Sequence, residues 1–332
     1  MRNRIIRWTA WALLAAVLIA APQISGRYYI NVLVLTGIFA LYAASYNLLL
    51  GYTGLLSFGH ALFFGGGAYA TAIALSHVQN LPLLPAVLIG GLAAIIFALI
   101  TSPLLARVSG TAFVMLTLAF GQLMYVFCLK FRSITGGEDG IGGFPIPSFN
   151  IPKIISIDMS DPLHYYYFAM VIIAASLWIL WFFTKTPLGS VMTGIRDNPK
   201  RVEYLGFKVA HTKAVVFIIS GFFAGIAGAL YALLQGLVST DGVLTIYSSF
   251  MPIMMIFIGG LNSFFGAVYG SVIFTILDEV ITAYTQHVEL IIGIIFIMIV
   301  MYTPTGFAGL LAYIRRKLRS RYPFLEFLGK TS

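Results

Sequence analysis

Charged side chains are scarce in this sequence: Asp, Glu, Lys and Arg together make up 9% of its 332 residues. Soluble globular domains carry about 25%. No formally charged residue lies between Arg27 and Arg107, and 60% of the chain is hydrophobic. Because no water-soluble fold can bury that much apolar surface, the composition excludes a soluble domain and predicts a protein embedded in the lipid bilayer.

Cysteine is nearly absent as well. The single Cys128 excludes a disulfide within the chain, and we expect it to be a small buried hydrophobe. Basic residues exceed acidic ones, giving a net charge of +9, but they cluster at the chain ends and in one loop. This distribution is typical of membrane topology signals and not of a nucleic-acid partner.

Long hydrophobic runs recur along the chain, each long enough to cross about 30 Å of hydrocarbon. They predict one all-α polytopic membrane domain over residues 1–332, with about ten spans including broken or re-entrant helices. The expected spans cover residues 8–25, 28–50, 51–76, 82–106, 111–129, 164–184, 214–238, 245–258, 265–277 and 290–312.

The distribution of Lys and Arg predicts the orientation of these spans. The N-terminus, the loop 185–213 and the basic tail 313–332 are rich in both, so we expect all three, and both termini, in the cytoplasm. The acidic loop 130–163 is then periplasmic. Both termini lie in the cytoplasm only if the number of spans is even, and it is even if the chain turns back at residues 259–262. Alternatively, the short segment 245–258 is re-entrant or broken.

The apolar stretch GYTGLLSFGHALFFGGGAYATAIAL, residues 51–75, contains six glycines. Glycine allows helices to pack closely in lipid, and it also permits the broken helices that line transport paths. The pattern Gly-Leu-x-Ser-Phe occurs at residues 54–58 and again at 260–264. A possible internal two-fold repeat follows, because many transporters are built from two such repeats.

These features give a candidate substrate path, whose alternative is simple close packing. Within it His60 is either a path residue or the partner in a helix–helix hydrogen bond. The expected path residues are Gly54, Ser57, His60, Gly65, Gly66, Tyr69, Gly260, Asn262 and Ser263.

The loop 185–213 predicts one short polar helix. Asp197 or Asn198 caps it, Pro199 occupies its first turn and Gly206 ends it. Val202 and Leu205 share one face. Because so short a helix is unstable alone, we expect it to dock against something; the alternative is a solvated basic loop.

The chain resembles the permeases of branched-chain amino-acid ABC importers, especially the LivM type. The resemblance is carried by SYNLLLGYTGLLSFGHALFFGGGAYATA, TGGEDGIGG, GIRDNPKRVEYLGFKVAHTKAVVFIISGFFAGIAGAL and IGGLNSFFGAVYGS, in this order. It implies a bacterial inner-membrane subunit that works with a second homologous permease, two cytoplasmic ATP-binding subunits and a periplasmic solute-binding protein.

The same resemblance implies that the loop helix couples the permease to the ATPase. The implied coupling residues are Arg196, Asp197, Asn198, Lys200, Glu203 and Gly206. For the glycine-rich outer loop we expect either a plain connection or a docking surface for the binding protein, formed by Arg132, Glu138, Asp139 and Lys153.

The function expected is import of branched-chain or related small amino acids, driven by partner ATPases. Importers of urea, amides or other amino acids stay open as alternatives, as does a secondary carrier or channel. An enzyme is not expected: the sequence has no HExxH motif and no complete nucleotide-binding loop, and it predicts no metal site and no cofactor.

Overall fold

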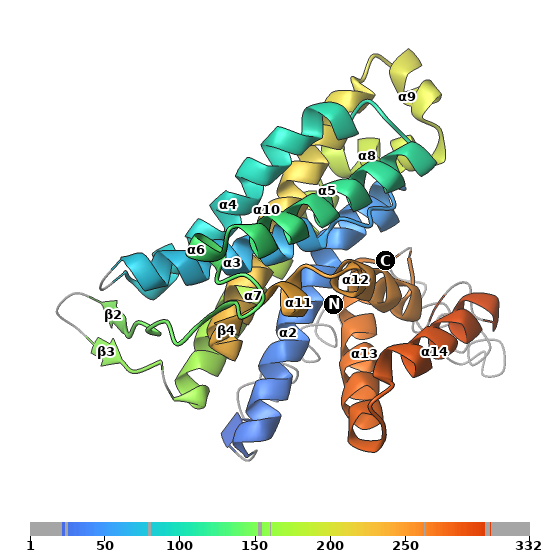
Figure 1. The fold of residues 1–332 in the computed structure, drawn as a ribbon. Helices are drawn as coiled ribbons and strands as arrows, with labels where there is room; N and C mark the ends of the chain where they lie inside the picture. Colours follow the sequence, from blue (N-terminus) through green and yellow to red (C-terminus); the bar gives the residue numbers. More distant parts are fainter. Residues whose placement is uncertain are drawn as a thin grey trace, which may run out of the picture.

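The computed structural model describes residues 22–23, 26–78, 81–151, 155–159, 161–261, 263–302 and 306. The predicted first span 8–25 and the basic tail 313–332 therefore lie outside the described residues, apart from residues 22–23. Within the described part, seven helices are long and apolar enough to cross a membrane, which confirms an all-α polytopic membrane protein (Figure 1).

The helices follow the hydrophobic runs closely. The long ones are α2 (Arg27–Asn47), α3 (Ala61–His77), α4 (Leu83–Leu105), α5 (Thr111–Lys130), α7 (Pro162–Thr184), α10 (Val209–Gln235), α12 (Ile246–Gly259), α13 (Phe264–Tyr284) and α14 (Val288–Tyr302). The short ones are α6 (Arg132–Thr135), α8 (Pro187–Asp197), α9 (Pro199–Tyr204) and α11 (Thr240–Val243). A π-helical turn, Leu48–Tyr52, extends α2, so the predicted span 51–76 becomes helical only from Ala61.

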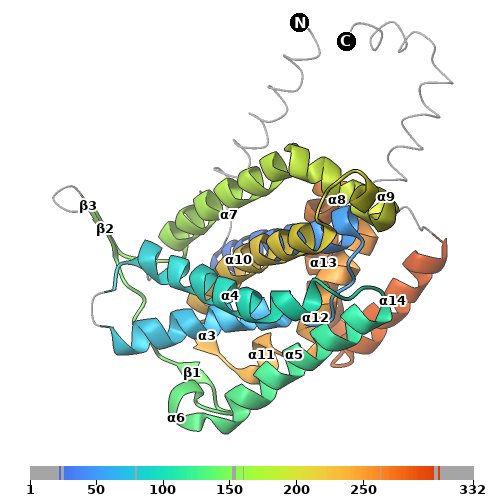
Figure 2. The ribbon, with the colours of Figure 1, turned by 90° about the horizontal axis from the view of Figure 1, so that it is seen from above.

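Helix α10 lies in the middle of the bundle and packs against α2, α3 and α4 (Figure 2). Glycines make this approach possible, because a Cβ atom on Gly67 would collide with the backbone of Gly225. One on Gly228 would likewise collide with the backbone of Phe64. Since lipid supplies little hydrophobic drive between helices, such close contacts are a main source of helix association.

Helices α12 and α13 form an antiparallel hairpin. The chain reverses at Gly260, whose φ is +116°, so the predicted turn at residues 259–262 is confirmed. Side chains on Gly259 or Gly270 would collide with the backbone of the facing helix. Helix α12 has 14 residues, about 21 Å at 1.5 Å per residue, and reaches membrane-spanning length only together with α11.

The two ends of the bundle differ in charge. At one end, here called the α9 end, are α8, α9 and most of the basic residues of the described chain. At the other end two short antiparallel strand pairs form: β1 (Ile141–Gly142) with β4 (Leu237–Val238), and β2 (Phe149–Ile151) with β3 (Ile155–Ile157). We call it the hairpin end after the β2–β3 hairpin, and not after the α12–α13 pair. This end carries the acidic residues Glu138, Asp139, Asp158, Asp161, Asp241, Asp278, Glu279 and Glu289.

We predict opposite effects for two glycine substitutions. Gly67→Ala forces α3 away from α10 and should cost about 1–3 kcal/mol, because the collision is with backbone. Gly293→Ala on α14 meets no described residue within 4 Å and should be neutral or stabilising, because Ala favours helix more than Gly. Thermal unfolding of the purified chain in detergent would compare them; equal melting temperatures would contradict the close contact.

Candidate functional site

Residues 54–59 interrupt the bundle with non-helical backbone between the π-turn and α3. Three hydroxyl groups from different helices hold this segment. The Tyr46 hydroxyl bonds both the N–H and the carbonyl of Ser57 at 2.9 Å. The N–H of Phe58 donates to Thr117 at 3.1 Å, and that of Ala61 donates to Ser249 at 3.1 Å. Non-helical backbone at membrane depth requires such partners.

His60 follows this break and is completely buried. Its Nε2 lies 3.2 Å from the Ser45 hydroxyl of α2, so the helix–helix hydrogen bond that we considered from the sequence is present. Its ring stacks on Tyr42, with centroids 5.3 Å apart, and meets the edges of Tyr46 and Phe63. Its Nδ1 has no hydrogen-bond partner among the described residues.

The two copies of Gly-Leu-x-Ser-Phe lie close together in space. The Asn47 side chain, just before the first copy, donates to the carbonyl of Ser263 in the second, at 3.2 Å. Gly54 and Gly260 both have positive φ, +73° and +116°, and each follows a helix and precedes another. Asn262 lies outside the described residues. Shared geometry at matching places is what a duplicated pair of broken helices requires, and the repeat itself stays a prediction.

The other predicted path residues lie in helix contacts. Gly65 faces the side chain of Leu244, Gly66 faces the ring of Phe97, and Tyr69 is 2% exposed. Their positions provide the close packing that was the alternative interpretation. Their role in a substrate path stays a prediction.

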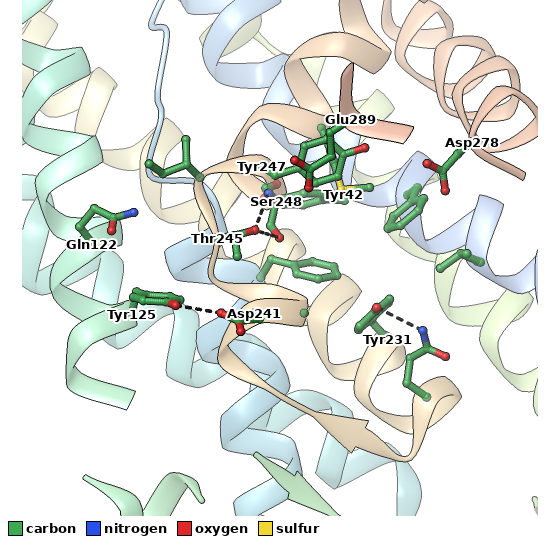
Figure 3. A pocket seen from close by; sticks show the side chains of 17 residues that line it. Tyr42, Gln122, Tyr125, Tyr231, Asp241, Thr245, Tyr247, Ser248, Asp278 and Glu289 are labelled. Atoms are coloured by element: carbon green, nitrogen blue, oxygen red, sulfur yellow. Dashed lines mark hydrogen bonds between the residues drawn. The ribbon is translucent and has the colours of Figure 1, made fainter. Parts of the chain in front are cut away.

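A cavity of about 760 Å³ opens elsewhere, among α2, α5, α10, α12, α13 and α14 (Figure 3). Its floor is formed by Phe39, Tyr42 and Phe64, which are buried, and its rim by exposed residues that include Asp241 and Glu289. It therefore opens toward the hairpin end and is closed toward the α9 end. His60 lies directly behind the Tyr42 ring of the floor.

The charged residues that line this cavity are all acidic. Asp241, Asp278 and Glu289 line it, and none of its lining residues is Lys, Arg or His. Tyr125 donates to Asp241 at 2.8 Å (Figure 3). Sequence reasoning did not single out these carboxylates, which lie near the ends of hydrophobic runs. The available signal was that the connections near them carry no Lys or Arg.

At the α9 end, the predicted short helix is confirmed as α9. The Asn198 side chain caps it by accepting from the N–H of Arg201 at 3.1 Å, and Gly206 follows it with φ +88°. Val202 is buried against Ile195 and Val209, whereas Leu205 is 71% exposed. Sequence reasoning missed α8, the 11-residue helix immediately before it.

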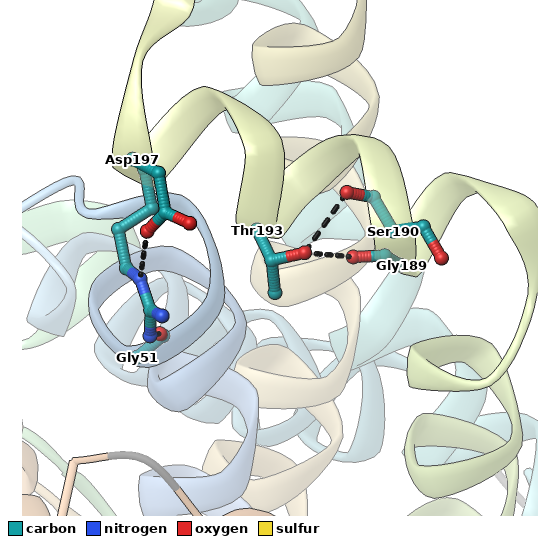
Figure 4. Close-up of polar contacts among 6 residues, drawn as sticks. Gly51, Gly189, Ser190, Thr193 and Asp197 are labelled. Atoms are coloured by element: carbon teal, nitrogen blue, oxygen red, sulfur yellow. Dashed lines mark hydrogen bonds and ion pairs between the residues drawn. The ribbon is translucent and has the colours of Figure 1, made fainter.

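Arg196, at the end of α8, connects this region to the helix break. Its Nη1 donates to the Gly51 carbonyl of the π-turn at 2.6 Å, and its Nε lies 3.4 Å from Asp197 (Figure 4). Its Cγ atom also lies so close to Gly54 that a Cβ atom added to this glycine would be 3.0 Å away. A charge-assisted bond of this kind contributes about 1.5–3 kcal/mol. Of the other predicted coupling residues, Lys200 and Glu203 are exposed on α9.

The predicted docking residues lie at the hairpin end. Arg132 and Glu138 form an exposed ion pair at 4.0 Å, and Asp139 is exposed beside them. Lys153 lies outside the described residues. An exposed pair of this kind contributes little to stability, so these side chains are free to meet a partner's charges.

Residues 28–302 match the family described as "Branched-chain amino acid transport system / permease component". The chain belongs to this family. The permease is 26% identical over 306 residues to the high-affinity branched-chain amino acid transport system permease protein LivM of Escherichia coli K12, covering 87% of this chain and 72% of that protein.

Two further relatives are similar to this permease over most of their length. The probable branched-chain amino acid transport permease protein LivM of Methanocaldococcus jannaschii is 22% identical, covering 81% of this chain and 90% of that protein. The LivH permease protein of the Escherichia coli K12 system is 23% identical, covering 84% and 94%. No solved structure matches the chain. With seven span-length helices among its described residues, the permease is a multi-pass membrane protein.

We predict that the α9 cap is specific for an oxygen acceptor at residue 198. Asn198→Ala removes the bond to the Arg201 N–H and should destabilise α9 by about 1 kcal/mol, raising amide exchange there about fivefold. Asn198→Asp keeps the acceptor and should exchange like the wild type. Hydrogen exchange followed by mass spectrometry on the whole chain measures both, and an unchanged rate in the Ala variant would rule out the cap.

Proposed function

We propose that this chain is the permease subunit of an ATP-binding-cassette importer that carries branched-chain or related small amino acids into the cytoplasm. Its family and the transport function named for its LivM relatives support the substrate class. The chain is also similar to LivH proteins, which supports pairing with a second, homologous permease. Two cytoplasmic ATPase subunits and a periplasmic binding protein complete the proposed assembly in the inner membrane.

The observation that carries the coupling step is the bond from Arg196 to the carbonyl of Gly51. In the proposed mechanism the ATPase pair binds the exposed side of α9 through Lys200, Glu203 and the flanking coupling residues. Movement of α9 is transmitted to α8 through buried Val202, which contacts Ile195. Through its bond to the Gly51 carbonyl, Arg196 then displaces the π-turn at the start of the helix break. Because π-helical turns often mark functional sites and are less regular than α-helix, this is a suitable place for a hinge.

The cavity supports alternating access. It is open toward the hairpin end and closed by Tyr42, whose hydroxyl donates to the Ser248 carbonyl of α12 at 3.1 Å. Parting α2 from α12 would break this bond and extend the cavity toward the α9 end. ATP binding can favour that state only if the ATPase pair contacts α9 better in one conformation than in the other.

Related importers of urea, amides or other amino acids would share this architecture, so the cargo stays part of the proposal. A secondary carrier is the alternative of another class. An ABC importer depends on ATP hydrolysed at the α9 end, whereas a carrier does not. The following variant tests this dependence.

We predict that Arg196→Ala uncouples the assembly. Leucine transported per ATP hydrolysed should fall about tenfold, because the link between α8 and the π-turn is lost. Arg107→Ala is the matched control: Arg107 is an exposed arginine at the same end, outside α8 and α9, and its replacement should leave the ratio unchanged. Both are measured with the complete transporter in proteoliposomes. Normal coupling in the Arg196 variant would refute the proposed transmission.

The orientation gives a second prediction. Tyr204 and Tyr284 are 89% and 87% exposed, at the α9 end and the hairpin end respectively. With the buried Cys128 replaced by Ser, a membrane-impermeant maleimide should label Tyr284→Cys in cells whose outer membrane alone is permeabilised. It should label Tyr204→Cys only after the inner membrane is opened. The reverse pattern would place α9 in the periplasm and end the coupling proposal.

A further inference from the structure

We propose that the cavity at the hairpin end is a binding site for the ammonium group of an apolar amino acid, with Asp278 and Glu289 as its anionic ligands and Asp241 at its mouth. This inference rests on the proposed function, and it names the residues that receive the cargo from the outer side.

The first argument is the lack of compensating charge. The ion pairs found in the described part of the chain join Arg132 with Glu138 and Arg196 with Asp197. Asp278 and Glu289 therefore have no basic partner there. Asp278 is only partly exposed, on a helix of membrane-spanning length. A carboxylate held at such a place without a cationic partner is costly, and such residues typically mark a transport path.

The second argument is the position of the neighbouring groups. Tyr247, from the first turn of α12, lines the cavity together with Asp278 and Glu289 (Figure 3). The two carboxylates, although on different helices, therefore belong to one cavity. Two carboxylates and a phenol oxygen offer acceptors to the three N–H groups of an ammonium ion.

The third argument is the opposite chemistry of the remaining wall. Leu35, Phe39, Phe64 and Met251 line the same cavity and offer an apolar surface for a branched side chain. The volume, about 760 Å³, is within the range of small-molecule pockets, roughly 300–1,000 Å³. A cavity lined both by carboxylates and by apolar side chains selects an amphipathic cation or zwitterion over an anion.

The position of the cavity fits reception from outside. Its rim is exposed at the hairpin end, and its floor is the Tyr42 ring that stacks on His60. A bound amino acid would thus rest on the ring whose hydroxyl holds α2 to α12. Occupancy of the cavity and opening of its floor would then involve the same side chain.

The chain offers a matched control within α13. Glu279 is the neighbour of Asp278 in sequence, but it does not line the cavity and accepts a hydrogen bond from Tyr28. Asp278→Asn and Glu289→Gln remove charge inside the cavity, while Glu279→Gln removes the same charge one residue away. Thermal unfolding of each variant confirms that it is folded before binding is measured.

The experiment measures tritiated L-leucine binding to the purified full chain in nanodiscs. We expect Asp278→Asn and Glu289→Gln each to weaken binding about tenfold or more, since each removes a charge-assisted contact, and Glu279→Gln to stay within about twofold. Wild-type protein adds a test that no folding defect can obscure. 3-Methylbutylamine, which lacks the carboxylate of leucine, should compete, and 4-methylpentanoate, which lacks the ammonium group, should not.

Several results would overturn the assignment. These are absence of leucine binding, equal weakening by the Glu279 control, or competition by 4-methylpentanoate as strong as that by the amine. Displacement of leucine by sodium chloride but not by choline chloride would instead identify a metal-cation site. ATP-dependent leucine uptake by the complete transporter is measured in parallel. If wild-type uptake is intact while the cavity fails these tests, the inference falls and the proposed function stands.

Discussion

The structure depends on one constraint: backbone that leaves the helical path inside a membrane must find all its hydrogen-bond partners within the protein. At residues 54–60 those partners are hydroxyl groups from α2, α5 and α12. A single break thereby ties three helices together. Each hydrogen bond between membrane helices contributes about 0.6 kcal/mol on average. The arrangement is therefore stabilised by several such bonds together, and breaking one of them costs little free energy.

The glycines make this arrangement compact. Gly59 lies so close to Thr117 that a Cβ atom would collide with its carbonyl, and Gly67 and Gly225 stand in the same relation across α3 and α10. Close approach keeps α3, α4 and α10 together as one unit. The α12–α13 hairpin forms a second unit with its own glycine contacts. Helix α2 joins the two units: its Ser45 carbonyl accepts from Ser220 of α10, and Tyr42 and Asn47 bond to Ser248 and Ser263.

This division explains why the two proposed functional regions lie where they do. The cavity opens between the two units at the hairpin end, and the Arg196 contact acts on the π-turn at the other end of α2. A displacement of α2 therefore affects both regions at once. In a membrane permease, such a shared helix provides a physical route by which events at opposite faces influence each other.

The sequence alone determined the membrane environment and the positions of most helices, and it indicated a turn at residues 259–262 and a cap of α9 at Asp197 or Asn198. These features follow from composition, from hydrophobic run length and from Gly, Pro and Asn at specific places, all of which are local. It also singled out Arg196 through its resemblance to known permeases, although not the carbonyl that Arg196 binds.

Only the tertiary structure decided which polar groups meet. Gly51 and Arg196 are 145 residues apart, and Asp241, Asp278 and Glu289 come from three separate elements. In lipid the hydrophobic pattern marks a helix as membrane-spanning but does not say which face turns inward, since the outside is as apolar as the core. In the sequence the glycines of α3 are equally consistent with a path or with packing. In the structure they lie in helix contacts, because Gly65 faces Leu244, Gly66 faces Phe97 of α4 and Gly67 faces Gly225 of α10.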